Sequence, residues 1–284
     1  MTAPPPRSWL FVPADSERKI AKALDSAADA IIFDLEDSVA PGSKAAAREL
    51  LKGLPRRSGG PAWWLRVNPL GSEDHKKDLD LIGRADLHGI VLPKTETGAD
   101  VVQLAHRTGH IPIHAIVTET AASLFGLLSY RDPRSPLAAM GWGAEDLSAA
   151  LGASSKYDAA GTLAFPYQLA RTLCLAGAVA AGVQPVDTVF PDFRDEAGLI
   201  AEARAAARDG FTGKMAIHPG QVEAINAAFT PSADEVAHAR AIVDAFAAAP
   251  DAGVLSVGGR MVDRPHLIQA ERVISRAGTQ ETIA

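Results

Sequence analysis

The sequence predicts a TIM (β/α)8 barrel, an α/β fold in which eight parallel strands alternate with eight helices. Eight short apolar runs, mostly continuous rather than alternating, are typical of strands covered on both faces. These runs span residues 8–12, 30–33, 63–67, 89–92, 113–117, 138–142, 185–190 and 213–217. Segments with a helical period separate them, at residues 16–28, 43–53, 73–84, 98–108, 120–129, 167–181, 194–208 and 219–229. An open doubly wound sheet is the alternative. It usually has fewer strands and a glycine-rich phosphate loop after the first strand, where this chain has Pro13-Ala14-Asp15.

Two regions lie outside the regular alternation. A longer interval before the seventh run predicts an insertion at residues 147–166. Beyond the eighth unit, the pattern predicts a helix at 232–248, a small hairpin at 254–263 and a closing helix at 265–277. We therefore expect a barrel domain over residues 1–230 and a C-terminal extension over 231–284. The extension either packs on its own barrel or covers the site of a neighbouring subunit as a lid.

Composition limits the class of protein. With 284 residues, 47% of them hydrophobic, the chain has enough material for a large core, which excludes disorder. The net charge of -6 provides no basic surface for nucleic acid or for an anionic membrane, so a small-molecule partner is expected. We expect no membrane span and a cytoplasmic location, because no apolar run reaches about 18 residues and residues 1–7 lack a signal core. The single cysteine, Cys174, excludes a disulfide framework and a thiolate metal site.

Carboxylates follow neighbouring predicted strands. In this fold the active site lies at the carboxyl ends of the strands, where Glu119 follows the fifth run and Asp146 follows the sixth. Neighbouring strands are about 5 Å apart, so both side chains can share one hard cation, and Mg²⁺ prefers such oxygen ligands. Zinc is disfavoured by the lack of a histidine pair or cysteine cluster at ligand spacing. Two alternatives stay open: Glu119 can be a solvated charge at a helix N-terminus, and Glu145 competes with Asp146 for the inward position.

Other charged residues follow the second, third and fourth runs. Arg66 has the fork geometry to bind a carboxylate bidentately, although a structural ion pair is an equal alternative. Of Asp34, Glu36 and Asp37, at least one is expected to orient Arg66 or a metal-bound water. Lys94 could form a Schiff base, as in a class I aldolase, but the carboxylate pair favours metal chemistry.

Seven strings of residues, in order over nearly the whole chain, resemble the citrate lyase β-subunit-like and malyl-CoA lyase family of the HpcH/HpaI aldolase superfamily. The strings are Ser8-Trp9-Leu10-Phe11-Val12-Pro13, Asp34-Leu35-Glu36-Asp37-Ser38-Val39, Leu65-Arg66-Val67-Asn68, Glu119-Thr120-Ala121, Gly143-Ala144-Glu145-Asp146-Leu147, Gly213-Lys214-Met215-Ala216-Ile217-His218-Pro219 and Met261-Val262-Asp263-Arg264-Pro265. One string alone would be weak, but seven in order are hard to obtain by chance.

The resemblance implies a Mg²⁺-dependent carbon–carbon lyase with a TIM barrel. Such an enzyme cleaves a malyl-, citramalyl- or citryl-type CoA thioester into an α-keto acid and an acyl-CoA, or catalyses the reverse condensation, usually as a homotrimer or a trimer-based assembly. By the same resemblance, Glu119 and Asp146 match the metal-binding carboxylates, and Arg66 matches the arginine that holds the substrate carboxylate. Asp263 matches an acidic residue on a C-terminal lid that enters the neighbouring subunit's site.

We therefore expect catalytic roles for Arg66, Glu119 and Asp263, and substrate contacts from Arg66, Glu119, Asp37 and Arg7. Arg7, with Lys19 and Lys22, is a candidate phosphate contact near the barrel mouth, although a solvated helix face competes as the role of the two lysines. Two other functions stay open. One is a Mg²⁺ aldolase acting on CoA-free keto acids, and the other is a non-catalytic subunit that binds CoA thioesters or keto acids.

Overall fold

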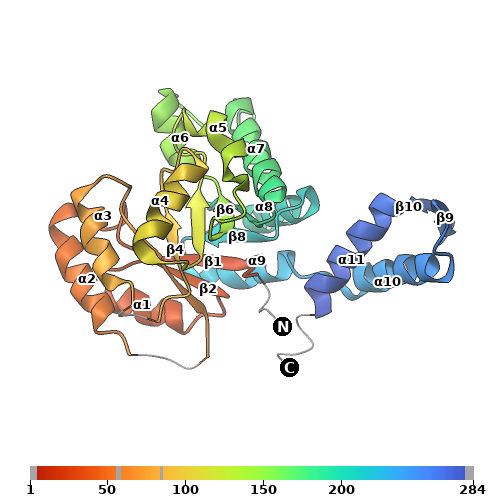
Figure 1. Ribbon diagram of the computed structural model, residues 1–284, viewed down its shortest axis with the longest axis horizontal. Coiled ribbons are helices and arrows are strands. Elements are labelled where there is room, and N and C mark those ends of the chain that lie inside the picture. The colour runs from red at the N-terminus through yellow and green to blue at the C-terminus, as the bar shows by residue number, and fades with distance from the viewer. Residues whose placement is uncertain (1–4, 56–58, 84–85, 279–284) are drawn as a thin grey trace. The chain divides into compact units, whose positions relative to one another are not determined.

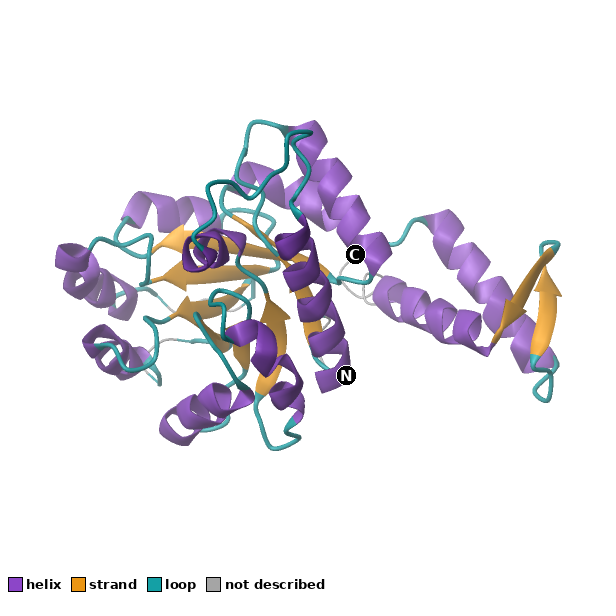
Figure 2. Cartoon of the chain, turned by 90° about the horizontal axis from the view of Figure 1, so that it is seen from above, coloured by secondary structure: helices purple, strands orange, loops and turns teal. Residues whose placement is uncertain are grey.

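The computed structural model describes residues 5–55, 59–83 and 86–278, and its main feature is a closed barrel of eight parallel strands (Figures 1 and 2). The strands follow one another around the barrel in chain order, and the eighth closes it by pairing with the first. They are β1 Ser8–Pro13, β2 Ala30–Asp34, β3 Ala62–Arg66, β4 Gly89–Leu92, β5 Ile113–Ile116, β6 Leu137–Gly141, β7 Gln184–Asp187 and β8 Gly213–Ala216. The predicted TIM barrel is confirmed, with a strand at each of the eight predicted runs.

Helices surround these strands, as Figure 2 shows. They are α1 Glu17–Leu24, α2 Lys44–Lys52, α3 Glu73–Asp78, α4 Gly98–Thr108, α5 Ser123–Gly126, α6 Ala144–Leu151, α7 Phe165–Ala181, α8 Glu196–Asp209 and α9 Val222–Ala228. Short 3₁₀ turns adjoin some of them, at η1 Pro41–Ser43, η2 Leu79–Leu81, η3 Leu127–Arg131 and η4 Pro219–Gln221. The predicted helices at 73–84, 120–129 and 219–229 each combine an α-helix with one of these turns, and residue 84 lies outside the described residues.

The predicted insertion at 147–166 overlaps a helix, α6, that the sequence pattern did not predict. Two residues separate helix α6 from β6, and the helix ends at Leu151, where Gly152, with a φ of 67°, is its left-handed C-cap. Its first turn contains both Glu145 and Asp146. The directions of these two side chains therefore follow helical rather than strand geometry.

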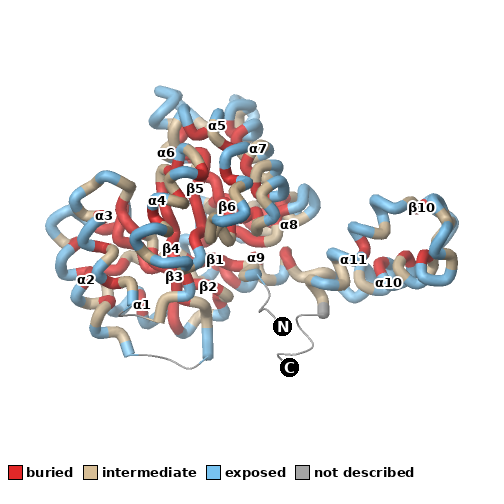
Figure 3. The backbone as a smooth tube through the Cα atoms, viewed as in Figure 1, coloured by how far each residue is buried: buried red, intermediate tan, exposed pale blue. Residues whose placement is uncertain are grey.

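Large side chains fill the barrel interior, and small residues on neighbouring strands leave the space for them. Trp9 packs edge-on against Trp64 and His114, with ring centroids 4.8 and 4.7 Å apart. Glycines make the room: a Cβ at Gly89 would lie 2.2 Å from the Trp64 ring, and one at Gly141 would lie 2.7 Å from His114 Nε2. Buried residues accordingly follow the strands in Figure 3. This packed interior holds the strand ends, and the side chains they carry, in fixed positions.

Two compact units divide the chain, the barrel from Pro6 to Asn226 and a second unit made of Pro5 with the described residues from Ala227 onward. The second unit contains α10 Ala233–Ala248, an antiparallel hairpin of β9 Val254–Val257 and β10 Arg260–Asp263, and α11 Arg264–Gly278. It has its own small core, made of Ala239, Ile242, Phe246, Val262 and Ala270. The proposed domain limits, 1–230 and 231–284, include residues 1–4 and 279–284, which lie outside the described residues. None of the helices in the described part of the chain has the length and hydrophobicity needed to cross a membrane.

Candidate active site

Arg66, at the end of β3, is held between Asp34, the last residue of β2, and Glu36, which follows that strand. Its Nε and Nη2 atoms donate to Oδ1 and Oδ2 of Asp34 at 2.7 and 2.6 Å, and its Nη1 lies 2.8 Å from Oε2 of Glu36. Asp34 and Arg66 are direct partners in the β2–β3 register, which explains the two parallel bonds. The guanidinium also lies over the ring of Phe11, 4.7 Å from its centroid. Arg66 therefore has one fixed orientation.

The attraction between the opposite charges of Asp34 and Arg66, together with their hydrogen bonds, has a larger effect on their pKa values than burial has. Burial alone would raise the pKa of Asp34 and lower that of Arg66, because both side chains are almost completely enclosed. The attraction between them instead lowers the pKa of Asp34 and raises that of Arg66. Both groups are thus charged at neutral pH, as binding a substrate carboxylate through Arg66 would require.

Lys94 joins the acidic residues at the carboxyl ends of β2, β5 and β6. Its backbone N donates to Glu119 Oε2 at 2.5 Å, and its Nζ lies 3.2 Å from Asp146 Oδ1 and 3.1 Å from Asp37 Oδ2. The same ammonium also donates to Glu36. Glu119 and Asp146, predicted as a pair from the sequence, therefore meet around this one residue.

Glu119 is 4% exposed, so its carboxyl group is almost completely removed from solvent. Burial, and then the negative charge of Glu36, raise the pKa of Glu119 to about 8, against a lowering contribution from the Lys94 backbone N–H. A Cβ at Gly143 would lie 2.7 Å from Glu119 Cγ, so the glycine leaves space for this side chain. Gly143, which directly precedes α6, was the signal in the sequence for a buried side chain here, and the prediction did not draw on it.

Asp146, rather than Glu145, faces this group of residues. Glu145 is exposed and pairs with Lys156, whereas Asp146 is 31% exposed and contacts Lys94. Their separation results from the first turn of α6 and not from the alternation of a strand, which is where the reasoning from sequence was wrong.

The structure disfavours the alternative that Lys94 forms a Schiff base. Burial would lower the pKa of its ammonium, but the hydrogen bond and charge of Glu36, followed by the contact with Asp37, raise it. A lysine that stays protonated is a poor nucleophile.

The donor set fits a hard cation with open coordination positions. No three acidic, histidine or cysteine side chains of the described residues enclose a possible metal position by themselves. Glu119 and Asp146 offer two carboxylates, and Mg²⁺ usually keeps only one or two of these and fills its other positions with water and substrate oxygens. The carboxylates would also gain from a cation, because Asp146 and Glu36 add to the unfavourable charge around Glu119.

Arg7 does not lie at the barrel mouth, and that prediction is wrong. It directly precedes β1, at the end opposite the carboxyl ends of the strands. There its Nε and backbone N both donate to Asp29 Oδ2 at 2.8 Å. A substrate contact from Arg7 is therefore not compatible with a site at the carboxyl ends.

Asp37 and Asp263 have different surroundings from the buried residues. The Asp37 side chain is 59% exposed and contacts Lys94. Asp263 ends β10 in the second unit, where its Oδ1 lies 2.5 Å from His266 Nδ1, and this hydrogen bond lowers the pKa of Asp263. Its catalytic role stays a prediction.

A cavity of about 1000 Å³ opens beside the ends of β1 and β8. Arg18, Lys19 and Lys22 of α1 line it, as do His218 and Gly220. His218 Nδ1 accepts from the backbone N of Gly220, and its ring stacks on Phe193 with centroids 4.7 Å apart. The cavity thus combines three exposed cations and an aromatic surface with two acidic residues, Asp25 and Glu223, and its cationic part suits a phosphorylated ligand.

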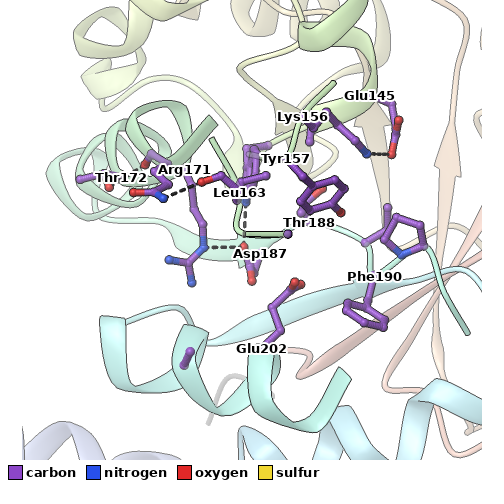
Figure 4. A pocket seen from close by; sticks show the side chains of 17 residues that line it. Glu145, Lys156, Tyr157, Leu163, Arg171, Thr172, Asp187, Thr188, Phe190 and Glu202 are labelled. Carbon is purple, nitrogen blue, oxygen red and sulfur yellow. Dashed lines mark hydrogen bonds and ion pairs between the residues drawn. The ribbon is translucent and has the colours of Figure 1, made fainter. Parts of the chain in front are cut away.

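A second cavity, of about 450 Å³, lies beside β7, α7 and α8 (Figure 4). Asp187 borders it and accepts from Trp142 Nε1 at 2.7 Å and Arg171 Nε at 3.2 Å, while Lys214 Nζ lies 3.2 Å from its other oxygen. Lys214 and Asp187 are both almost completely buried, and they are partners in the β7–β8 register. This pair was not among the residues predicted from sequence, although a lysine within an apolar run was the available signal. Its contacts indicate a structural role.

Known proteins resemble this chain over nearly its whole length. The family model of HpcH/HpaI aldolase/citrate lyase matches residues 7–219. A citrate lyase subunit beta-like protein of Mycobacterium tuberculosis is 37% identical over 270 residues, which cover 95% of both chains. A (3S)-malyl-CoA thioesterase of Cereibacter sphaeroides is 36% identical over 279 residues, which cover 97% of this chain and 95% of the relative. Among solved structures, protein CitE from Mycobacterium tuberculosis in complex with magnesium, acetoacetate and coenzyme A has a TM-score of 0.83 at 37% identity, covering 96% of this chain and 98% of that one.

Proposed function

The chain belongs to the HpcH/HpaI aldolase/citrate lyase family, and on that premise we propose that it is a Mg²⁺-dependent carbon–carbon lyase. Its substrate is a hydroxyacyl-CoA thioester of the malyl, citramalyl or citryl type. Cleavage yields an α-keto acid and an acyl-CoA, and the reverse reaction is the corresponding condensation. The observation that carries the proposal is the convergence of Glu119 and Asp146 on Lys94, beside an Arg66 held for carboxylate binding.

Glu119 and Asp146 are the residues that would hold Mg²⁺. The metal supplies Lewis-acid stabilisation of the negative charge that develops on the substrate hydroxyl oxygen. A related structure was solved with magnesium, acetoacetate and coenzyme A, which supports both the metal and the ligand class for this chain.

Arg66 would bind the carboxylate of the keto-acid half of the substrate. Two of its N–H groups donate to Asp34 and its Nη1 lies 2.8 Å from Glu36 Oε2; a guanidinium has five N–H donors, so donors remain for a ligand. Because its orientation is fixed before substrate arrives, little conformational entropy is lost on binding.

Asp263 would handle the proton at the thioester carbon. The substrate hydroxyl gives up its proton to solvent as its oxygen becomes the keto carbonyl, the electron pair of the breaking carbon–carbon bond forms the enolate of the acyl thioester, and the enolate takes a proton from the Asp263 carboxyl group. In the condensation direction the same carboxylate removes that proton. We propose that Asp263 reaches the site of a neighbouring subunit as part of a lid in a homotrimer.

The cavity beside β1 and β8 supports a CoA ligand over a CoA-free keto acid. Arg18, Lys19 and Lys22 provide positive charge for phosphate groups near the carboxyl ends of these strands. A small keto acid would leave this charged cavity without a partner.

A panel assay tests the proposal. The protein is incubated with malyl-, citramalyl- and citryl-CoA and with the CoA-free hydroxy acids, with and without Mg²⁺, while keto acid, acyl-CoA and free CoA are measured separately. Mg²⁺-dependent release of equal amounts of keto acid and acyl-CoA is expected. Release of free CoA without keto acid, cleavage of CoA-free acids alone, or binding without products would each contradict it.

A further inference from the structure

Lys94 has an unusual backbone for a residue with a long side chain. Its φ is 53°, and it is the only non-glycine residue in the described segments with a positive φ. This left-handed conformation is disfavoured for residues with a Cβ and tends to occur where function requires it. Here it allows the backbone N–H to reach Glu119 while the side chain extends toward Asp146.

The ammonium of Lys94 contacts three carboxylates, which differ in what holds them. Glu36 is 2% exposed and is also paired with Arg66, and Asp37 is an exposed neighbour on the same loop. Asp146, by contrast, has Lys94 as its ion-pair partner among the described residues. If another cation took Asp146, the ammonium would keep its contacts with Glu36 and Asp37.

We propose that Lys94 is a positioning residue that serves as an internal cation for the acidic site and competes with the metal for Asp146. The inference rests on the Mg²⁺ site of the proposed function. Without metal, the ammonium neutralises Asp146, and the backbone N–H of Lys94 holds Glu119. When metal binds, the ammonium shifts to Glu36 and Asp37, so its charge sets how tightly the site holds Mg²⁺.

The charge balance gives this proposal its direction. Replacing Lys94 by methionine removes one positive charge that lies 3.2 Å from Asp146 Oδ1, and this charge would repel a cation bound by the same carboxylate. It also removes the group that occupies an oxygen of Asp146. Both changes favour Mg²⁺, so the variant should bind the metal more tightly than the wild type.

Calorimetric titration with Mg²⁺ tests the proposal on the metal-free proteins. Lys94→Met removes the charge, and Lys94→Gly does the same while accepting a positive φ without strain, so the second variant serves if the first fails to fold. Lys156→Met is the matched control, because Lys156 pairs with Glu145, the neighbour of Asp146, rather than with Asp146 itself. We expect at least about fivefold tighter Mg²⁺ binding in both Lys94 variants and less than about twofold change in the control.

Thermal unfolding provides a second readout that does not depend on catalysis. The rise in Tm on adding Mg²⁺ should be larger for the Lys94 variants than for the wild type, because a tighter ligand stabilises the folded state more. Unchanged or weaker Mg²⁺ binding in both Lys94 variants, or an equal effect of Lys156→Met, would overturn the role of Lys94. Absence of Mg²⁺ binding by the wild type and all variants would instead contradict the proposed function.

Discussion

Arg66 donates from Nε and Nη2 to the two carboxylate oxygens of Asp34, at 2.7 and 2.6 Å, across adjacent strands of the barrel. Asp34 is buried and the Arg66 side chain is only 13% exposed, so each charge depends on the other for its stability. This one relationship connects the fold with the proposed chemistry, because the arginine predicted to bind substrate is also part of the barrel wall.

Arg66→Met should lower the free energy of unfolding by about 3–5 kcal/mol, because it leaves the buried Asp34 carboxylate without its partner. The double variant Arg66→Met with Asp34→Leu should be less destabilised than Arg66→Met alone. Urea denaturation measures both, with Lys52→Met, which breaks an exposed pair with Glu49, as a control expected to change by no more than about 0.5 kcal/mol. Equal losses in Arg66→Met and Lys52→Met would refute this assignment.

Glu119→Gln should abolish Mg²⁺-dependent turnover without destabilising the metal-free protein. The carboxylate is buried beside Glu36 and Asp146, so its charge costs the folded state free energy in the absence of metal. The amide has nearly the same shape but is a weaker metal ligand. Turnover and metal-free Tm are the measurements, and Glu145→Gln is the matched control, since Glu145 is exposed and paired with Lys156. A Glu119→Gln protein that keeps wild-type activity would remove Glu119 from the metal site.

Gly143→Ala should weaken Mg²⁺ binding by about tenfold or more, through Glu119. The backbone at Gly143, with φ of -119° and ψ of 112°, is accessible to alanine, so strain in φ and ψ does not arise. The new Cβ would instead lie 2.7 Å from Glu119 Cγ and displace that side chain. Calorimetry measures the affinity. Gly253→Ala, at a position with nothing within 4 Å of an added Cβ, should leave it unchanged. Equal affinities in the two variants would argue against the contact.

His114 should make the fold sensitive to acid. Burial lowers the pKa of His114 to about 3, so the folded state keeps the ring neutral while an unfolded chain takes up a proton below about pH 6.5. The contribution of His114 to the free energy of unfolding is therefore nearly constant well above pH 6.5. It becomes increasingly unfavourable to the folded state as the pH falls from there toward 3. Relative to His114→Leu, the wild type should lose about 1.6 kcal/mol of unfolding free energy between pH 6.5 and pH 5. Denaturation curves at both pH values give this difference, and parallel pH profiles for the two proteins would contradict it.

Asp263→Ala should stop the exchange of acetyl-CoA methyl protons with solvent while leaving Mg²⁺ binding intact. The reason is that Asp263 is proposed to carry the proton at the thioester carbon, whereas the metal is held by residues of the barrel. Exchange in deuterated water, followed by proton NMR, measures the step. Asp251→Asn in the same unit is the control, and undiminished exchange in Asp263→Ala would remove this residue from the scheme.

Much of the fold could be predicted because it depends on periodicity. Apolar runs such as residues 30–33 and 89–92 have the length and composition of strands buried on both faces, and helical segments separate them. Their order implies a parallel barrel, and a parallel barrel places the residues that follow the strands at one end. Arg66, Glu119 and Asp146 could therefore be grouped from sequence, whereas Arg7 was misplaced because it precedes its strand rather than follows it.

The sequence by itself determined the strand order, the end of the barrel that carries charged residues, and the family. Only the tertiary structure decided which side chains of that end meet. Asp146 rather than Glu145 contacts Lys94 because the chain has already entered α6, and Lys94 reaches both Glu119 and Asp146 because its backbone is left-handed. Hydrophobic patterning averages over many residues, but the direction of a single side chain depends on local backbone angles and on packing across strands that are distant in the chain.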